Sequence, residues 1–281
     1  MPFADLGSLH LHYELTGSGP PMILMAGWTL NTRFWDGVAP LLSKDYSVVA
    51  FDLRGTGRST SDPELEYSRM ADAEDLARVM DHLGIERAHL VGHSKGARVA
   101  LTFAMLNPYR ALSVTAIGSA EPHGAPEGQR AFRPIAHAWV QKARDMALRD
   151  GPRAATAFLA QGKLFGKLRT SPEGVRRLHH AMEGYEAADL VSMTPRRELD
   201  TEALVPNLTM PILFLVGESD PFLPECQYAH ERISTSVFKV IPGSGHMLPL
   251  EKPPLVASTI LDWLGCVLQG HSTNDTPKYQ G

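Results

Sequence analysis

The chain has 281 residues and a formal net charge of −4, with 27 Lys and Arg against 31 Asp and Glu. Hydrophobic residues make up 43% of it, an ordinary globular composition that excludes the disordered and fibrous classes. The slightly acidic balance argues against nucleic acid as a partner, and no apolar run reaches the roughly 18 residues of a membrane helix.

The N-terminal sequence and the cysteines bear on the cellular compartment. Residues 1–5 lack the basic start and the apolar stretch of a secretory signal. Two cysteines, Cys226 and Cys266, are too few for a disulfide framework in a chain of this length. No Cys/His cluster has the spacing of a zinc site. We therefore expect a cytoplasmic protein without a metal, either a monomer or a homodimer.

Short apolar strands alternate with amphipathic helices over the first 120 residues. Apolar and polar residues alternate over 9–15, which predicts a half-buried strand that ends at the Gly- and Pro-rich segment 17–21. The elements predicted after it are strand 22–25, strand 46–51, helix 70–83, strand 88–91, helix 95–106 and strand 114–117. This alternation predicts an α/β fold, a mostly parallel twisted sheet with helices on both faces.

The strand pattern stops near residue 122 and resumes near residue 208. The intervening residues show mostly helical patterns, at 131–149, 153–164 and 173–183. Strands at 210–216 and 237–241 follow, with a last helix after Pro253-Pro254. We expect a core of residues 1–122 and 208–268, a helical cap (lid) at 123–207, and a flexible polar tail at 269–281.

The strongest chemical signal is Gly92-His93-Ser94-Lys95-Gly96, which matches the pattern G-x-S-x-G. It lies between a predicted strand and a predicted helix. A turn this tight strains the serine backbone and needs small neighbours, and it raises the serine oxygen above the sheet edge at a helix N-terminus. The alternative is a Gly/Ser turn without chemistry.

A nucleophilic serine needs a base, and the base needs an acid that orients it. Asp220 lies just past the C-terminal end of the predicted strand 210–216, and His246 lies in the loop after the strand 237–241. Three candidates in the order Ser, acid, His thus fall at strand ends on one sheet edge, where open α/β sheets place their sites. The alternatives are a turn-forming Asp220 and a solvated His246.

These motifs resemble those of the α/β-hydrolases, in the branch of esterases, haloperoxidase-like enzymes and C–C hydrolases. The resemblance covers roughly residues 8–268 and rests on the serine motif and on residues 51–59, 217–222, 243–246 and 251–253. It implies Ser94 as nucleophile, Asp220 as acid and His246 as base, with the helical cap closing over the site. The motifs are specific for the superfamily and say little about the substrate.

The resemblance also implies an oxyanion hole made by two backbone N–H groups. One belongs to Lys95, and the other to Trp28 in the loop after strand 22–25. Relatives usually open that loop with His-Gly, whereas this chain has Ala26-Gly27. Support of the loop and the shape of the pocket must therefore differ. The Trp28 indole either lines the acyl pocket or packs in the core.

Other polar residues have less certain roles. The Lys95 side chain either binds an acidic group or, as we favour, forms an ion pair or stays solvated. Glu121 follows strand 114–117, where some relatives keep their acid, and it rivals Asp220 although the context of Asp220 fits better. Candidates for the substrate pocket are Gly27, Glu121, Trp139 and Met247. We interpret a further group as structural: Asp52, Arg54, Arg58 and His93.

The leading hypothesis is a serine hydrolase that cleaves an ester, lactone or similar carbonyl bond of a small apolar molecule and needs no cofactor. Three alternatives stay open. Cofactor-free dioxygenases of this fold also carry a Gly-Trp loop like Gly27-Trp28, but typically have His where this chain has Lys95. C–C bond hydrolases use the same triad. Some proteins of the fold are receptors without catalysis.

Overall fold

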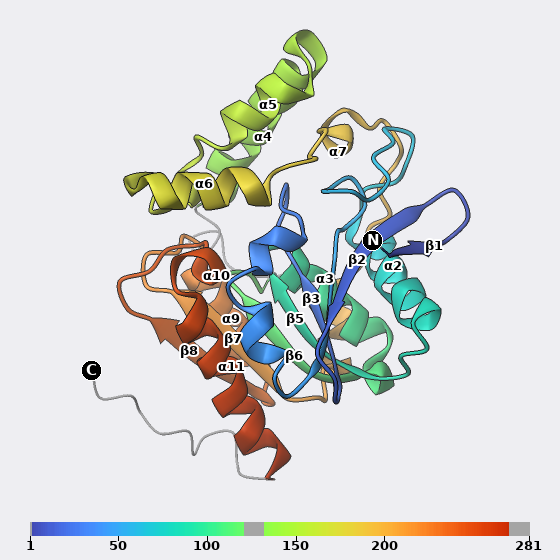
Figure 1. The fold of residues 1–281 in the computed structure, drawn as a ribbon, viewed down its shortest axis with the longest axis vertical. Coiled ribbons are helices and arrows are strands. Elements are labelled where there is room, and N and C mark those ends of the chain that lie inside the picture. Colours follow the sequence, from blue (N-terminus) through green and yellow to red (C-terminus); the bar gives the residue numbers. More distant parts are fainter. Residues whose placement is uncertain (1, 121–131, 270–281) are drawn as a thin grey trace.

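The computed structural model of the chain describes residues 2–120 and 132–269. Within them, eight strands form one sheet in the order β1-β2-β4-β3-β5-β6-β7-β8 (Figure 1). The strand β2 pairs antiparallel with β1 and β4, and all other pairs are parallel. The strands are β1 (Phe3–Asp5), β2 (His10–Thr16), β3 (Pro21–Met25), β4 (Ser47–Phe51), β5 (Ala88–His93), β6 (Ala111–Ile117), β7 (Ile212–Gly217) and β8 (Ser236–Ile241).

The central strands are apolar along their whole length because both faces of the sheet are covered. In β3, Met22 and Leu24 belong to the hydrophobic cluster on one face, while Ile23 and Met25 belong to the cluster on the other. The same alternation holds in β4 and β7. Continuous apolar runs therefore become strands with two buried faces, as the period of two requires.

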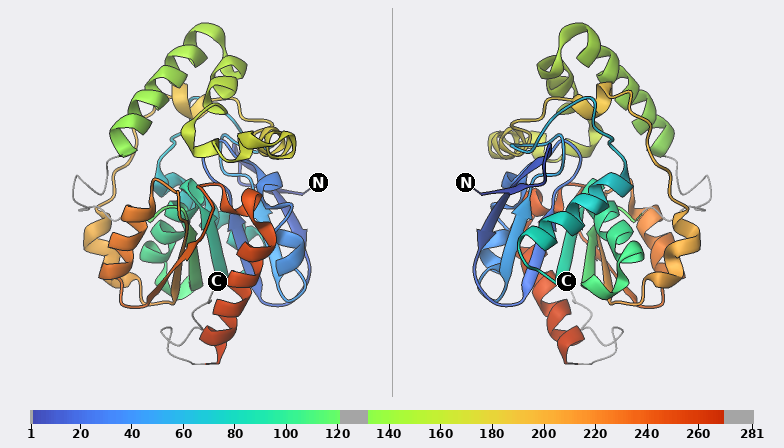
Figure 2. Two further views of the ribbon diagram at one scale, coloured as in Figure 1. Left: turned by 90° about the vertical axis from the view of Figure 1, so that its left-hand side faces the viewer. Right: turned by 90° about the vertical axis from the view of Figure 1, so that its right-hand side faces the viewer.

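Helices supply the cover on each face. The cluster on one face includes residues of α1 (Ala39–Leu42) and α11 (Pro253–Leu268), which also contact each other. The cluster on the other face includes residues of α2 (Arg69–His82), α3 (Lys95–Leu106) and α9 (Leu223–Arg232). The two views in Figure 2 show these layers from opposite sides. The observed architecture is the expected three-layer α/β fold.

A helical segment between β6 and β7 lies over one end of the sheet (Figures 1 and 2). Its helices are α4 (Phe132–Asp150), α5 (Pro152–Leu159), α6 (Pro172–Ala181) and α7 (Ala188–Val191), whereas α8 (Thr201–Leu204), the last helix before β7, packs beside the core against α3. Leu159, Leu178 and Met182 of this segment share a hydrophobic cluster with Phe34 and Trp35, which follow β3 in the chain. Short elements complete the fold: α10 (Leu248–Glu251) and the 3-10 turns η1 (Thr32–Trp35), η2 (Pro108–Arg110), η4 (Lys163–Phe165), η5 (Leu168–Thr170) and η6 (Val205–Asn207).

The observed elements differ from the expected ones in a few places. The predicted helix 95–106 is observed with those bounds, whereas the predicted helix 153–164 ends at Leu159. Beyond its end the chain passes close to the Trp139 ring, since a Cβ on Gly162 would lie 2.3 Å from it. The antiparallel β1 and helix α9 were not predicted. The expected tail at 269–281 lies outside the described residues except for position 269, and the boundaries of core and cap stay a prediction.

Among the residues that the structure describes, no helix combines the length and the apolar character that a membrane crossing requires.

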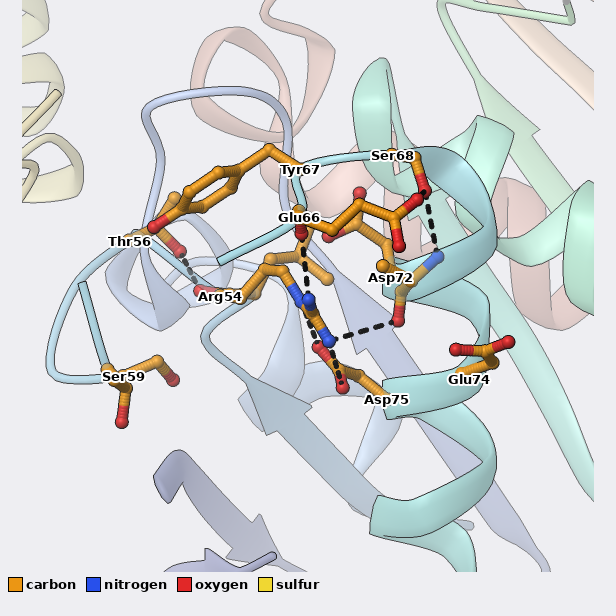
Figure 3. Close-up of polar contacts among 12 residues, drawn as sticks. Arg54, Thr56, Ser59, Glu66, Tyr67, Ser68, Asp72, Glu74 and Asp75 are labelled. Atoms are coloured by element: carbon orange, nitrogen blue, oxygen red, sulfur yellow. Dashed lines mark hydrogen bonds and ion pairs between the residues drawn. The ribbon is translucent and has the colours of Figure 1, made fainter. Parts of the chain in front are cut away.

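A buried ion pair fastens the loop after β4 to helix α2 (Figure 3). The Arg54 guanidinium donates from Nε to Asp75 Oδ2 at 2.6 Å and from a second nitrogen to Asp75 Oδ1 at 2.7 Å. A third bond reaches the Glu66 carbonyl at 2.8 Å. The two side chains are 8% and 1% exposed, so each charge depends on the other for compensation.

Replacing Asp75 by alanine will strongly destabilise the fold because the Arg54 charge then stays buried without its carboxylate. We expect a loss of about 3–5 kcal/mol in the free energy of unfolding, measured by urea denaturation. The control is Glu74→Ala on the same helix, which removes a half-exposed partner of Arg197 and will cost below about 1 kcal/mol. Equal losses in the two variants would contradict this prediction.

The stability will also depend on pH through His89. This residue is 5% exposed, its Nδ1 lies 2.9 Å from Ser113 Oγ, and burial lowers its pKa from 6.5 to about 4. Below about pH 6.5, His89 is protonated in the unfolded chain but stays neutral in the folded protein. The free energy of unfolding therefore falls as the pH drops from about 6.5 to about 4. His89→Gln will reduce this slope by up to about 1.4 kcal/mol per pH unit. Urea denaturation at pH 7.5, 6 and 5 measures it, and a slope unchanged from the wild type would contradict the assignment.

Candidate active site

Ser94 lies in a strained turn between β5 and α3. Its backbone has φ 51°, a left-handed conformation that non-glycine residues rarely adopt. The Ser94 N–H donates to the Ile117 carbonyl of β6 at 2.8 Å, and the Ser94 carbonyl accepts from the Arg98 N–H at 3.2 Å. The Ser94 side chain makes no capping bond to α3, which leaves its hydroxyl for other chemistry.

Two glycines allow this turn. A Cβ on Gly92 would lie 2.2 Å from the Gly96 carbonyl oxygen, and a Cβ on Gly96 would lie 2.1 Å from the Met25 carbonyl oxygen. Both contacts are with backbone, so no side-chain movement relieves them. The two glycines of the G-x-S-x-G pattern are thus required by the close packing of α3, β5 and β3. This agrees with the small neighbours predicted from the sequence.

Asp220 and His246 meet at the carboxyl ends of β7 and β8. His246 Nδ1 lies 2.8 Å from Asp220 Oδ2, and Asp220 Oδ1 accepts from the Phe222 N–H at 2.9 Å. Both residues are nearly fully buried, at 2% and 4% exposure. The other ring nitrogen, His246 Nε2, has no hydrogen-bond partner among the described residues. The acid therefore fixes the ring and leaves Nε2 available.

Gly118, just after β6, makes room for this pair. It has φ +64°, and a Cβ at this position would lie 2.8 Å from Asp220 Oδ2 and 3.1 Å from His246 Nδ1. A side chain here would separate the acid from the imidazole. The sequence interpretation did not single out Gly118, although its place directly after strand 114–117 was a usable signal.

His93 joins the serine turn to the histidine loop. Its Nε2–H donates to the His246 backbone carbonyl at 2.8 Å, and its ring centroid lies 4.6 Å from that of Phe34, with the ring planes tilted by 30°. Complete burial lowers the pKa of His93 well below 6.5, and the nearby His246 lowers it further. The ring therefore stays neutral, consistent with the structural role expected for His93.

The Gly27-Trp28 loop lies against Ser94. A Cβ on Gly27 would lie 2.8 Å from His93 Nδ1 and 3.3 Å from Ser94 Cβ, so only glycine lets the backbone approach this closely. The Trp28 peptide follows directly. The loop is further tied by Asp52, whose Oδ1 accepts from the Thr32 N–H at 2.6 Å.

Lys95 directs its side chain into an ion pair. Its Nζ lies 3.0 Å from Asp72 Oδ2, and the two side chains are 17% and 1% exposed. Asp72 lies in the first turn of α2, where the helix dipole favours a negative charge. The ion-paired alternative for Lys95 is the one observed, and Asp72 was not predicted because its partner lies 23 residues away in the sequence.

These groups surround one pocket of about 640 Å³. The predicted residues Gly27, Trp28, Ser94, Lys95, Trp139, His246 and Met247 all line it. Asp220 lies behind His246, and Glu121 lies outside the described residues. Within residues 2–120 and 132–269, no group of three or more His, Cys, Asp or Glu side chains could hold a metal ion.

Comparisons with known proteins show which proteins the chain resembles. The profile of a family described as alpha/beta hydrolase fold matches residues 20–253. An esterase structure from Thermogutta terrifontis has a TM-score of 0.75 and 29% identity, covering 92% of this chain and 94% of its own. A putative carbamate hydrolase from Pseudomonas savastanoi pv. phaseolicola is 27% identical over 90% of this chain and 97% of its own. A fluoroacetate dehalogenase from Burkholderia sp. is 38% identical, but the match covers 40% of this chain and 38% of that protein.

The backbone contact at Gly96 gives a stability prediction that is independent of the reaction. Gly96→Ala will cost about 3 kcal/mol or more because α3 and β3 must separate to admit the methyl group. The matched control is Gly265→Ala in α11, where a Cβ meets nothing within 4 Å. That variant will gain roughly 0.5–1 kcal/mol from helix propensity. Thermal and urea unfolding of both variants checks the prediction, and a Gly96→Ala protein as stable as the wild type would contradict it.

Proposed function

Because the chain belongs to the α/β hydrolase fold family, we propose that it is a serine hydrolase acting through Ser94, His246 and Asp220. The substrate is an ester, lactone or related carbonyl compound of a small, largely apolar molecule. One observation carries the proposal: Asp220 fixes His246 through Nδ1, its Nε2 has no hydrogen-bond partner among the described residues, and His246 lines the same pocket as the strained Ser94. That is the arrangement of a base beside a nucleophile.

In the proposed reaction, His246 Nε2 takes the Ser94 proton as the serine oxygen attacks the carbonyl carbon. Asp220 holds the Nδ1–H tautomer and stabilises the imidazolium that forms. The protonated His246 then gives its proton to the leaving alcohol, which yields an acyl-Ser94 ester. Water activated by His246 hydrolyses this ester and releases the acid.

Negative charge develops on the carbonyl oxygen during both steps. We assign its stabilisation to the backbone N–H groups of Trp28 and Lys95. Lys95 opens α3, so the helix dipole adds to the field at this point. The close approach of Gly27 to Ser94 supports Trp28 as the second donor, because the Trp28 N–H belongs to the peptide unit after Gly27.

The wall of the pocket supports an apolar acyl or alcohol group. Apolar side chains line it from the Gly27-Trp28 loop, from the helical segment and from the core: Trp28, Leu30, Trp139, Val140, Leu164, Phe165, Val99, Phe222 and Met247. Charged side chains, among them Arg69, Arg98 and Arg196, line other parts of the same pocket. The contribution of residues 139–165 supports the proposal that the segment 123–207 acts as a cap over the site. Burial of such surfaces contributes roughly 25 cal/mol per Å² to substrate binding.

The resemblance to a dehalogenase does not extend to a carbon–halogen reaction in this proposal. Displacement of a halide by Ser94 would join the serine oxygen to an alkyl carbon as an ether. His246-activated water has no carbonyl to attack in an ether, so the enzyme would not turn over. Attack on a carbonyl instead yields an ester that water hydrolyses, which fits a serine nucleophile.

The proposal predicts covalent labelling of Ser94. A fluorophosphonate probe will add one adduct to the wild type, read by intact-protein mass, and none to Ser94→Ala. Ser119→Ala, which removes another serine hydroxyl lining the same pocket, will still take one adduct.

The proposal also predicts the effect of Asp220→Asn on turnover. A panel of p-nitrophenyl esters and lactones identifies the best substrate. On that substrate Asp220→Asn will lower kcat by about 10⁴-fold, because it favours the wrong imidazole tautomer.

A wild type that takes no adduct and turns over none of the panel would overturn the proposal. Substrate-dependent O₂ consumption would then favour a cofactor-free dioxygenase, and saturable ligand binding without turnover would favour a receptor.

A further inference from the structure

The loop that carries the proposed oxyanion donor is held by the helical segment. This oxyanion loop, residues 26–31, has Ala26 where relatives usually have His, so its support must come from elsewhere. The Trp28 indole Nε1–H donates to Asp189 Oδ2 at 2.6 Å. The Tyr185 hydroxyl donates to Asp189 Oδ1 at 2.7 Å. Each carboxylate oxygen of Asp189 therefore accepts one strong bond, and Trp28 is held by a side chain 161 residues away in the sequence.

The partly buried ring of Trp28 also contacts two aromatic rings. It meets the Tyr185 ring edge-on at 6.3 Å and the Trp139 ring edge-on at 6.0 Å. Burial raises the pKa of Tyr185 well above 10, and Asp189 raises it further, so the phenol keeps its proton and stays a donor. Edge-to-face contacts of this kind fix ring orientation beyond the area they bury.

Asn31 ties the other end of the oxyanion loop to the same segment. Its side-chain amide donates to the carbonyls of His180 at 3.1 Å and Glu183 at 2.9 Å. Its backbone N–H donates to the Ala181 carbonyl at 2.8 Å. The loop is therefore fastened at two points, Trp28 and Asn31, to residues 180–189.

Thr29, between these two points, has an unfavourable backbone conformation. Its φ is 70° and it is buried, although β-branched residues avoid the left-handed region. Such a conformation costs on the order of 1–3 kcal/mol and persists only where the surroundings impose it. The bonds at Trp28 and Asn31 are the constraints that flank it. The peptide between Gly27 and Trp28 has one further tie, from the Leu30 N–H to the Gly27 carbonyl at 3.1 Å, so loss of the Trp28 bond removes one of the constraints on its direction.

From these contacts we propose that Asp189 is a positioning residue for the oxyanion hole. By holding the Trp28 indole, it sets the direction of the Trp28 backbone N–H beside Ser94. The inference rests on the proposed function, since it concerns the same reaction. It makes the helical segment a part of the catalytic geometry, and it predicts that loss of Asp189 weakens binding of the transition state rather than of the substrate.

The test uses Asp189→Ala on the full chain with the best ester of the panel. We expect kcat to fall about 10–100-fold with KM changed less than about threefold, below the 10²–10³-fold cost of removing an oxyanion donor outright. Affinity for a trifluoromethyl ketone, which forms an oxyanion on Ser94, will fall by the same factor as kcat. Asp189→Asn keeps one acceptor oxygen and will recover part of the loss.

Two further variants separate positioning from structure. Glu186→Ala removes an exposed carboxylate from the same segment and will leave kcat and KM unchanged. Trp28→Phe keeps an aromatic ring but removes the indole N–H, so it will lower kcat as Asp189→Ala does. The double variant will be no worse than either single one, because both remove the same bond. Thermal unfolding confirms that each variant is folded, and Trp28→Phe carries the test should Asp189→Ala not fold.

The outcomes distinguish this inference from the proposed function. A wild-type Ser94 that neither labels nor turns over ester overturns both. A reactive Ser94 with unchanged kcat in Asp189→Ala or Trp28→Phe overturns the positioning role alone. A rise in KM at constant kcat also overturns it, because Asp189 would then contact the substrate directly.

Discussion

Backbone-to-backbone contact at the Ser94 turn is the constraint on which the rest of the site depends. Gly92 and Gly96 leave no room for a side chain between α3, β5 and β3, so the serine is held at φ 51° above the sheet edge. Strain of this size, on the order of 1–3 kcal/mol, persists only where the packing around it is dense. The carboxyl ends of the parallel strands lie at the same edge of the sheet. Asp220 follows β7 and His246 follows β8, so both residues lie at that edge.

Helix α2 supplies the buried negative charge around this edge. Asp72 and Asp75 lie three residues apart, on one face of the helix, and each compensates a cation of another element. Arg54 belongs to the loop after β4, and Lys95 follows the serine. The ammonium of Lys95, the residue after Ser94, is therefore already compensated by a carboxylate of the protein.

The features of the site that depend on the local geometry of one chain segment were predicted from sequence patterns. The glycines at 92 and 96, the strand ends before Asp220 and His246, and helix 95–106 follow from spacing that a single segment carries. Asp72 and Asp189 were missed because their roles arise from partners in other elements. Helix α9 was missed because Cys226 and Ala229 give its buried face little apolar contrast. Ala26 did indicate that the oxyanion loop has a different support, but nothing in the sequence names Asp189.

The helical segment shares a hydrophobic cluster with one face of the sheet, and this cluster limits how easily the segment can detach. Met182 and Leu178 pack with Phe34 and Trp35 in one continuous apolar body. Detaching the segment would expose part of that body to water, at roughly 25 cal/mol per Å² of apolar surface. Under the proposed function, substrate entry by movement of the whole segment away from the sheet would therefore carry a cost in free energy. In that case the segment would stay in place during the reaction, and the volume enclosed beneath it would limit the size of the substrates that reach Ser94.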